Sequence, residues 1–175
     1  MDKLSSPQVN PLCADNPRLR DVPLVVGVSL TFGFVDDVLL VCHGRAPLRD
    51  DEWQRLLAYT TKPGYRSLLV STLGGEPDRV QRHQLHARLT ASPRRVPRVA
   101  VLTTSPTMRW AHIARRWIDT VDAKTFAFEE VTSASQYLGC RAAPERLARA
   151  RDRARYLLEK RVLQQRVSRF LTHTH

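Results

Sequence analysis

The order of apolar and polar positions divides the chain into alternating strands and helices. Apolar runs rich in β-branched residues predict five strands, at 24–32, 38–43, 65–72, 99–103 and 124–128. Helical spacing of apolar residues predicts five helices, at 49–62, 77–89, 105–118, 129–138 and 144–171. Only a turn at residues 33–37 separates the first two strands, so we expect them to form a hairpin.

Local signals mark where several of these helices begin and end. Acidic residues at 50–52 suit the positive end of a helix dipole, and Pro63 stops the helix that they open. Pro77 opens the second helix, whose expected apolar side carries Val80, Leu85 and Leu89. Gly139 is placed to end the fourth helix in a left-handed conformation.

The resulting order, ββαβαβαβα plus a long C-terminal helix, predicts an α/β fold with a mixed, mostly parallel sheet and helices packed against it. We expect residues 1–22 to be an irregular lead-in, because prolines are frequent there and apolar periodicity is weak. Residues 23–140 form the expected α/β domain, and residues 141–175 form a basic helical extension.

Positive charge is concentrated in this extension. The chain holds 28 Lys and Arg against 17 Asp and Glu, a net charge of +11. From residue 141 onward ten basic residues face three acidic ones, so the last fifth of the chain carries +7. Such a balance favours an acidic partner, which could be a protein surface, nucleic acid or anionic lipid.

The last helix also carries an apolar stripe. Leu147, Ala150, Ala154, Leu157 and Leu158 form it, and Leu163, Val167, Phe170 and Leu171 are expected to continue it. The helix could pack on its own domain or on a copy of itself, dock on an acidic partner, or bind nucleic acid or lipid. The candidate contacts are Arg149, Arg153, Arg155, Lys160, Arg161, Arg166 and Arg169.

A second candidate site lies at the carboxyl edge of the predicted parallel strands, where ligands of open α/β sheets usually bind. Glycines, hydroxyls, arginines and two helix N-termini would meet there and suit an anion. The alternative is that these residues only make turns, helix caps and a solvated surface. The residues concerned are His43, Arg45, Ser71, Thr72, Gly74, Gly75, Thr103, Thr104, Ser105 and Arg109.

No catalytic set, metal site or cofactor motif is expected. Cys42 and His43 are neighbours on a strand, so their side chains point to opposite faces. His83 and His86 lack further ligands, and the glycine-rich segment lacks the nucleotide-binding spacings. Three widely spaced cysteines predict no disulfide framework. The tryptophans are expected in the core rather than as stacking platforms for bases; they are Trp53, Trp110 and Trp117.

The chain contains no apolar run long enough to cross a bilayer and no apolar core of a signal peptide, so we expect a cytoplasmic location without a transmembrane segment.

Several short motifs resemble a family. These are Asp51-Glu52-Trp53, Gly74-Gly75-Glu76-Pro77 with Gln81-Arg82, Val99-Ala100-Val101 with Thr104-Ser105 and Arg109, and Phe126 with Tyr137-Leu138-Gly139. In order and spacing they resemble the STAS-like proteins of bacteria, which share the fold of anti-sigma-factor antagonists. The resemblance covers roughly residues 36–140 and implies the fold more than a particular function; the role that we expect is signalling or regulation.

One departure concerns phosphorylation. The better-known antagonists carry an Asp-Ser pair at the start of the helix after the third strand, and that serine is phosphorylated. Here the junction holds Ser71 and Thr72 without such a pair. We expect a non-enzymatic regulatory module that binds a protein partner or itself, responsive to an anion or to modification of these hydroxyls. A protein binding nucleic acid or anionic lipid through the last helix is the alternative, and an enzyme for a small phosphorylated or lipidic ligand a third class.

Overall fold

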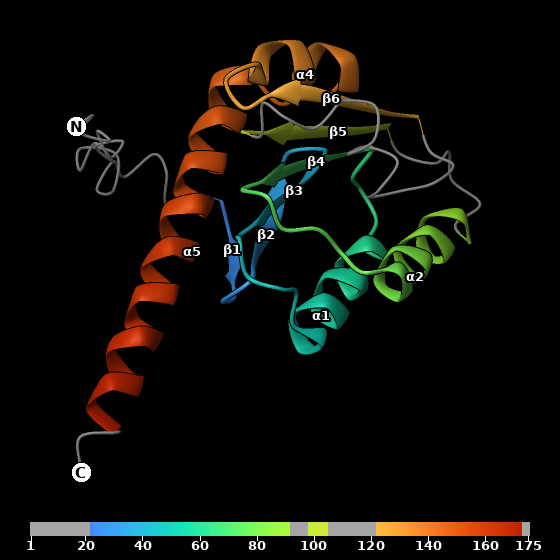
Figure 1. The fold of residues 1–175 in the computed structure, drawn as a ribbon. Coiled ribbons are helices and arrows are strands. Elements are labelled where there is room, and N and C mark those ends of the chain that lie inside the picture. The colour runs from blue at the N-terminus through green and yellow to red at the C-terminus, as the bar shows by residue number, and fades with distance from the viewer. Residues whose placement is uncertain (1–21, 92–97, 105–121, 173–175) are drawn as a thin grey trace, which may run out of the picture.

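A computed structural model describes residues 22–91, 98–104 and 122–172, with side chains described through residue 168. A six-stranded sheet forms the centre of this part of the chain (Figure 1). Its strands are adjacent in chain order: β1 (Leu24–Val26), β2 (Leu30–Val35), β3 (Val38–His43), β4 (Ser67–Thr72), β5 (Arg98–Thr103) and β6 (Ala123–Ala127). The fold class is therefore α/β, as the sequence predicts.

The sheet is mixed. The first three strands pair antiparallel, and β3 to β6 run parallel. Two crossover helices, α1 (Asp50–Thr60) and α2 (Arg79–Thr90), connect β3 to β4 and β4 to β5. Both crossovers move in the same direction across the sheet, from one parallel strand to the next. Such crossovers share one handedness, so both helices lie on the same face of the sheet.

That face is covered by a large apolar core. Trp53, Leu56 and Leu57 of α1 pack with Leu85 and Leu89 of α2 on strand residues. The side chain of Trp53 is fully buried, and its indole N–H donates a 3.0 Å hydrogen bond to Oε1 of Gln84. The expectation that Trp53 belongs to the core is confirmed; Trp110 and Trp117 lie outside the described residues.

Two helices cover the opposite face. They are α4 (Val131–Leu138) and α5 (Pro144–Thr172). Leu147, Ala150 and Ala154 of α5 are buried in the second core cluster, and Leu158 is 2% exposed. Figure 1 shows α5 lying along the sheet and then running on beyond it. The first half of the predicted extension is therefore part of the folded core.

One prediction at the start of the domain is wrong. Residues 24–32 are not a single strand, because the chain reverses between β1 and β2 and the two strands pair antiparallel. The amide of Gly27 donates to the carbonyl of Leu30 at 2.7 Å across this reversal. The β2–β3 reversal follows at Asp36, which has a positive φ of 53°, and Asp37.

The second helix also differs in detail. It begins at Arg79 rather than Pro77, because Asp78 forms a capping box with Gln81. Val80 is 64% exposed and does not belong to the apolar side that we expected. Gly139 ends α4 with φ 59°, as predicted. The predicted helix at 105–118 lies outside the described residues.

Candidate functional site

The carboxyl ends of the parallel strands meet as expected. His43 of β3 pairs in register with Thr72 of β4, and Thr72 pairs with Thr103 of β5. Side chains alternate along a strand, so these three residues fall on the α1 and α2 face, in line with Val41, Val70 and Val101. All three are buried, with 1–3% of their surface exposed. This part of the edge is packed.

The turn after β4 is closed by its own residues. The hydroxyl of Thr72 donates a 2.7 Å hydrogen bond to the carbonyl of Gly75, and it accepts one of 3.2 Å from the amide of Gly74. Gly74 has a φ of 115°, which glycine adopts without strain. Thr72 therefore organises the turn, and its oxygen is engaged on both sides.

His43 fills the space beside this turn. Its Nε2 lies 3.2 Å from the carbonyl oxygen of Ala46. A Cβ on Gly75 would come within 2.3 Å of its ring, so only glycine fits there. Burial lowers the pKa of His43 below the ordinary value of 6.5. The ring is therefore neutral at pH 7 and adds no positive charge to the edge.

The other predicted edge residues separate into groups. Arg45, Gly74 and Thr104 are exposed. Ser71 is 4% exposed and pairs in register with Cys42, on the face that α5 covers. Ser105 and Arg109 lie outside the described residues. The structure thus brings the strand residues together and separates Ser71 from the hydroxyls of the opposite face.

Cys42 is not an activated nucleophile. It is buried, and desolvation raises the pKa of its thiol to about 12. Its Sγ lies 3.8 Å from the carbonyl oxygen of Arg151 on α5. A thiol attacks as the thiolate, and this one stays protonated at neutral pH. Within the described ranges no group of three metal-ligating side chains comes together.

Glu52 has a role that its place in the sequence did not reveal. Its carboxylate reaches from α1 to the β1–β2 turn and accepts hydrogen bonds from the amides of Val28, Ser29 and Leu30 at 2.7–2.9 Å. The Ser29 hydroxyl donates another, at 2.7 Å. A Cβ on Gly27 would lie 2.4 Å from this carboxylate. The Asp51-Glu52-Trp53 motif therefore supplies a carboxylate that shapes the turn and an indole that fills the core.

The half of α5 that packs on the sheet, residues 144–158, is called its anchored half, and some of its arginines contact the domain. Arg151 is 7% exposed and donates a hydrogen bond to the carbonyl of Phe128, just after β6. Its guanidinium lies 4.1 Å from the centre of the Phe128 ring, and that of Arg155 lies 5.1 Å from it. Arg153 donates to the carbonyl of Val22 at 3.4 Å. Arg149 is exposed. Arg153 and Arg155, predicted as partner contacts, thus also bind their own domain.

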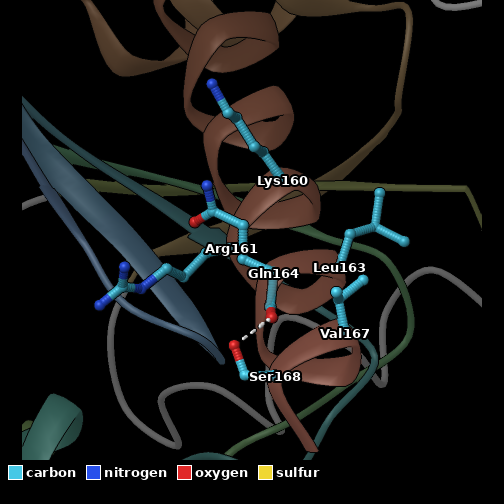
Figure 2. A pocket seen from close by; sticks show the side chains of 6 residues that line it. All are labelled: Lys160, Arg161, Leu163, Gln164, Val167 and Ser168. Carbon is cyan, nitrogen blue, oxygen red and sulfur yellow. Dashed lines mark hydrogen bonds between the residues drawn. The ribbon is translucent and has the colours of Figure 1, made fainter. Parts of the chain in front are cut away.

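The projecting half of α5, residues 159–172, presents charge and apolar surface together. Lys160, Arg161 and Arg166 are exposed; the side chain of Arg169 is outside the described part. Leu163 and Val167 are 61% and 60% exposed. An open hollow on the helix is lined by Lys160, Arg161, Leu163, Gln164, Val167 and Ser168. Figure 2 shows Leu163 and Val167 beside each other, with Arg161 on the other side of the helix.

In the part of α5 whose side chains are described, the apolar stripe is therefore not continuous, contrary to our expectation. Phe170 and Leu171, also predicted for it, lie outside that part. At 100° per residue, Leu163 and Val167 lie on the opposite side of the helix from Leu147, Ala154 and Leu158. The first group is exposed and the second is buried. Tyr156, which is 38% exposed, falls on the outward side with Leu163 and Val167. We call the side that carries Tyr156, Lys160, Leu163 and Val167 the outward face of α5.

Among the described helices none is long and apolar enough to span a membrane. Comparison of the chain with protein-family models, with curated proteins and with solved structures finds no match.

Proposed function

We propose that this chain is a non-enzymatic, STAS-like regulatory module that binds a helix of a protein partner on the outward face of α5. One observation carries the proposal. Leu163 and Val167 are more than half exposed on a helix whose other end is built into the core. Exposed aliphatic side chains on an amphipathic helix are the usual anchors of helix recognition.

The surroundings of this apolar pair favour a protein. An apolar centre with a polar, charged rim is the usual composition of a protein interface. Here Lys160 and Gln164 flank the pair, and they line the same hollow. Contacts with nucleic acid go mainly to phosphates, which need basic side chains and make no use of Leu163 or Val167.

The alternative, binding to nucleic acid or anionic lipid, has its own support. Lys160, Arg161 and Arg166 are exposed, and residues 160–172 contain no Asp or Glu. Such a segment attracts any polyanion, and the attraction falls steeply with salt. The two proposals differ in whether apolar contact or charge supplies the binding free energy.

The remaining parts of the proposal rest on local chemistry. The protonated Cys42 thiol and the neutral His43 support a non-enzymatic role. The STAS-like assignment rests on the Asp51-Glu52-Trp53 and glycine-turn motifs, which occupy a helix start and a strand end of an α/β sheet. The free thiols of Cys42 and Cys140 support a reducing, cytoplasmic location. Regulation by modification remains proposed for Ser71 and Thr72, which are buried and would need local opening.

A synthetic probe tests the choice between partners. The probe is a fluorescent helical peptide with leucines at heptad a and d positions and glutamates at e and g. We expect it to bind the chain, measured by fluorescence anisotropy at nanomolar protein. The double variant Leu163→Ser/Val167→Ser should lose this binding, whereas Val80→Ser, which removes an equally exposed aliphatic side chain from α2, should keep it.

The same variants distinguish protein binding from the alternative, binding to nucleic acid or anionic lipid. A fluorescent DNA duplex and vesicles containing anionic lipid serve as probes at about 100 and 500 mM salt. If the duplex or vesicles bind at low salt, the peptide does not, and the Leu163→Ser/Val167→Ser variant is unaffected, the protein-binding proposal is wrong. Loss of duplex binding in Lys160→Gln/Arg161→Gln would then assign the contact to α5.

A further inference from the structure

The outward face of α5 repeats with the period of a coiled coil. Tyr156, Lys160, Leu163 and Val167 are separated by four, three and four positions. This spacing keeps one seam of a helix facing a partner helix. Three of the four are large apolar side chains that are exposed in the described part of α5, at 38%, 61% and 60%. The seam lies opposite the buried side of α5, so the domain itself leaves it uncovered.

We infer that the occupant of this seam is the α5 helix of a second copy of the chain, packed antiparallel. The inference rests on the proposed function and names the partner for the same surface. It makes the protein a two-fold symmetric dimer, because each outward face binds the other.

The antiparallel direction follows from Lys160. In a parallel pair, equivalent seam positions meet, and Lys160 would face its own copy in the middle of the interface. In an antiparallel pair, Lys160 lies opposite Leu163 of the second copy, and Tyr156 lies opposite Val167. The aliphatic stem of Lys160 then covers the leucine while its ammonium group reaches water.

The charges beside the seam agree with this register. Glu159 and Arg166 both lie on the same flank of the seam, seven positions apart. The antiparallel register brings Glu159 of one copy next to Arg166 of the other, and the symmetry repeats this ion pair. Oε1 of Glu159 accepts a hydrogen bond from Arg155 at 3.0 Å, and the Glu159 side chain is 39% exposed, so its carboxylate can accept a second partner.

The domains are compatible with this arrangement. Each α5 is anchored through Leu158 and earlier buried residues on its inward side, and its seam lies on the outward side. Antiparallel helices place the two domains at opposite ends of the pair. This separation reduces the repulsion between two chains that each carry a charge of +11.

Disulfide trapping tests direction and register together. The background carries Cys13→Ser and Cys140→Ser and keeps Cys42, which is buried and protonated. Two variants are then made, Tyr156→Cys and Val167→Cys, one with a size tag, and far-UV circular dichroism checks that both fold. Under mild oxidation we expect cross-linked dimers only when the two variants are mixed, because residue 156 meets residue 167 of the other copy.

Each other result overturns the inference. Cross-linking within either variant alone indicates a parallel pair. The absence of cross-links in all samples, with a monomeric mass by light scattering, excludes a second copy as the occupant. In that case binding of the acidic peptide to the monomer still supports a protein partner, whereas its failure to bind removes the proposed function as well.

Charge exchange gives an independent readout. Arg166→Glu should weaken dimerisation about tenfold or more, because it places two carboxylates next to each other. The double variant Glu159→Arg/Arg166→Glu should restore it. Arg161→Glu makes the same change in charge on the other side of the helix, and it should have a much smaller effect. If Arg166→Glu and Arg161→Glu weaken the dimer equally, the proposed register is wrong.

Discussion

Leu158 lies against Gly44, and this contact is where α5 leaves the sheet. A Cβ on Gly44 would stand 3.4 Å from Cδ2 of Leu158. Leu158 is 2% exposed, and none of the described α5 residues after it is buried. The contact is the boundary between the anchored half and the projecting half of α5. Removing one half or the other should affect the stability of the fold differently.

Two truncations should separate these halves. A chain ending at Lys160 keeps Leu147, Ala150, Ala154 and Leu158, so we expect a cooperative thermal transition close to that of the full chain. A chain ending at Gly139 loses them. Each buried leucine alone contributes roughly 2–3 kcal/mol, a large part of a typical total stability. We expect this shorter chain to show no cooperative transition by circular dichroism; a sharp transition would contradict the packing described.

Glu52→Gln should destabilise the fold although it changes few atoms. The amide nitrogen of glutamine is a donor, and it would face backbone amides that now donate to the carboxylate. We expect the free energy of unfolding to fall by about 1.5–3 kcal/mol, the range for hydrogen bonds to a charged group. Urea denaturation measures it. Glu129→Gln, at an exposed position, is the control and should be neutral.

The same carboxylate predicts an acid-sensitive stability. Burial of Glu52 acts to raise its pKa, but the hydrogen bonds from Val28, Ser29 and Leu30 outweigh it and hold the pKa below the ordinary 4.5. A carboxyl whose pKa is lowered by folding stabilises the fold above its unfolded pKa, and this contribution is lost as pH falls through the folded pKa. Denaturation of the wild type between pH 6 and 3, about the range of ordinary Glu titration, should therefore show a steeper loss than Glu52→Gln. Parallel curves would refute this role.

Gly75→Ala should be more damaging than Gly74→Ala. A methyl group at residue 75 would stand 2.3 Å from the His43 ring and 2.5 Å from the carbonyl oxygen of Gly44, whereas the space beside Gly74 is open. Gly74→Ala still carries the strain of φ 115°, which costs about 1 kcal/mol. We expect Gly75→Ala to lower the free energy of unfolding by about 2 kcal/mol or more, which is in the range observed for overpacked cores. Thermal denaturation compares the two variants, and equal losses would show that the clash relaxes freely.

Arg151→Lys tests whether α5 is held by a specific guanidinium. Lysine keeps the charge but cannot both hydrogen-bond the Phe128 carbonyl and stack on its ring as Arg151 does. We expect a loss of about 1–2 kcal/mol in unfolding free energy. Arg149→Lys, at an exposed position of the same helix, should change it little. A similar effect at both positions would mean that charge alone matters.

The sequence was a good guide where local chemistry decides the structure. Gly139 and the proline at 144 mark a helix end and a helix start, and both agree with the structure. The reversal at residues 27–29 was missed because a distant residue holds it. The run at 24–32 is mostly apolar and rich in β-branched residues. Its turn depends on the Glu52 carboxylate, 22 to 24 positions later.

The seam on α5 was missed for a different reason. Its residues belong to a long helix whose apolar positions move from one side to the opposite side near Leu158. In the sequence alone, one stripe that shifts gradually around the helix accounts for the positions before Leu158 and for those after it. Only the structure shows which set the sheet covers. The alignment of His43, Thr72 and Thr103 was predicted because parallel strands bring their ends together. The closed turn made by Thr72 was not, because it depends on hydroxyl geometry.

The reversal between β2 and β3 has a consequence for the far end of the molecule. The carboxylate of Asp37 accepts from the amide of Arg141 at 2.9 Å, and Asp36 pairs with Arg146 at 3.1 Å. These contacts fix where α5 starts, and Leu158 on Gly44 fixes where it departs. Since a helix is stiff over this length, two fixed points define a line. The last 14 residues of α5, 159–172, therefore extend about 20 Å from the sheet as a rigid helix. Whatever binds there is held at a set angle to the sheet, whereas a flexible tether would fix only its distance.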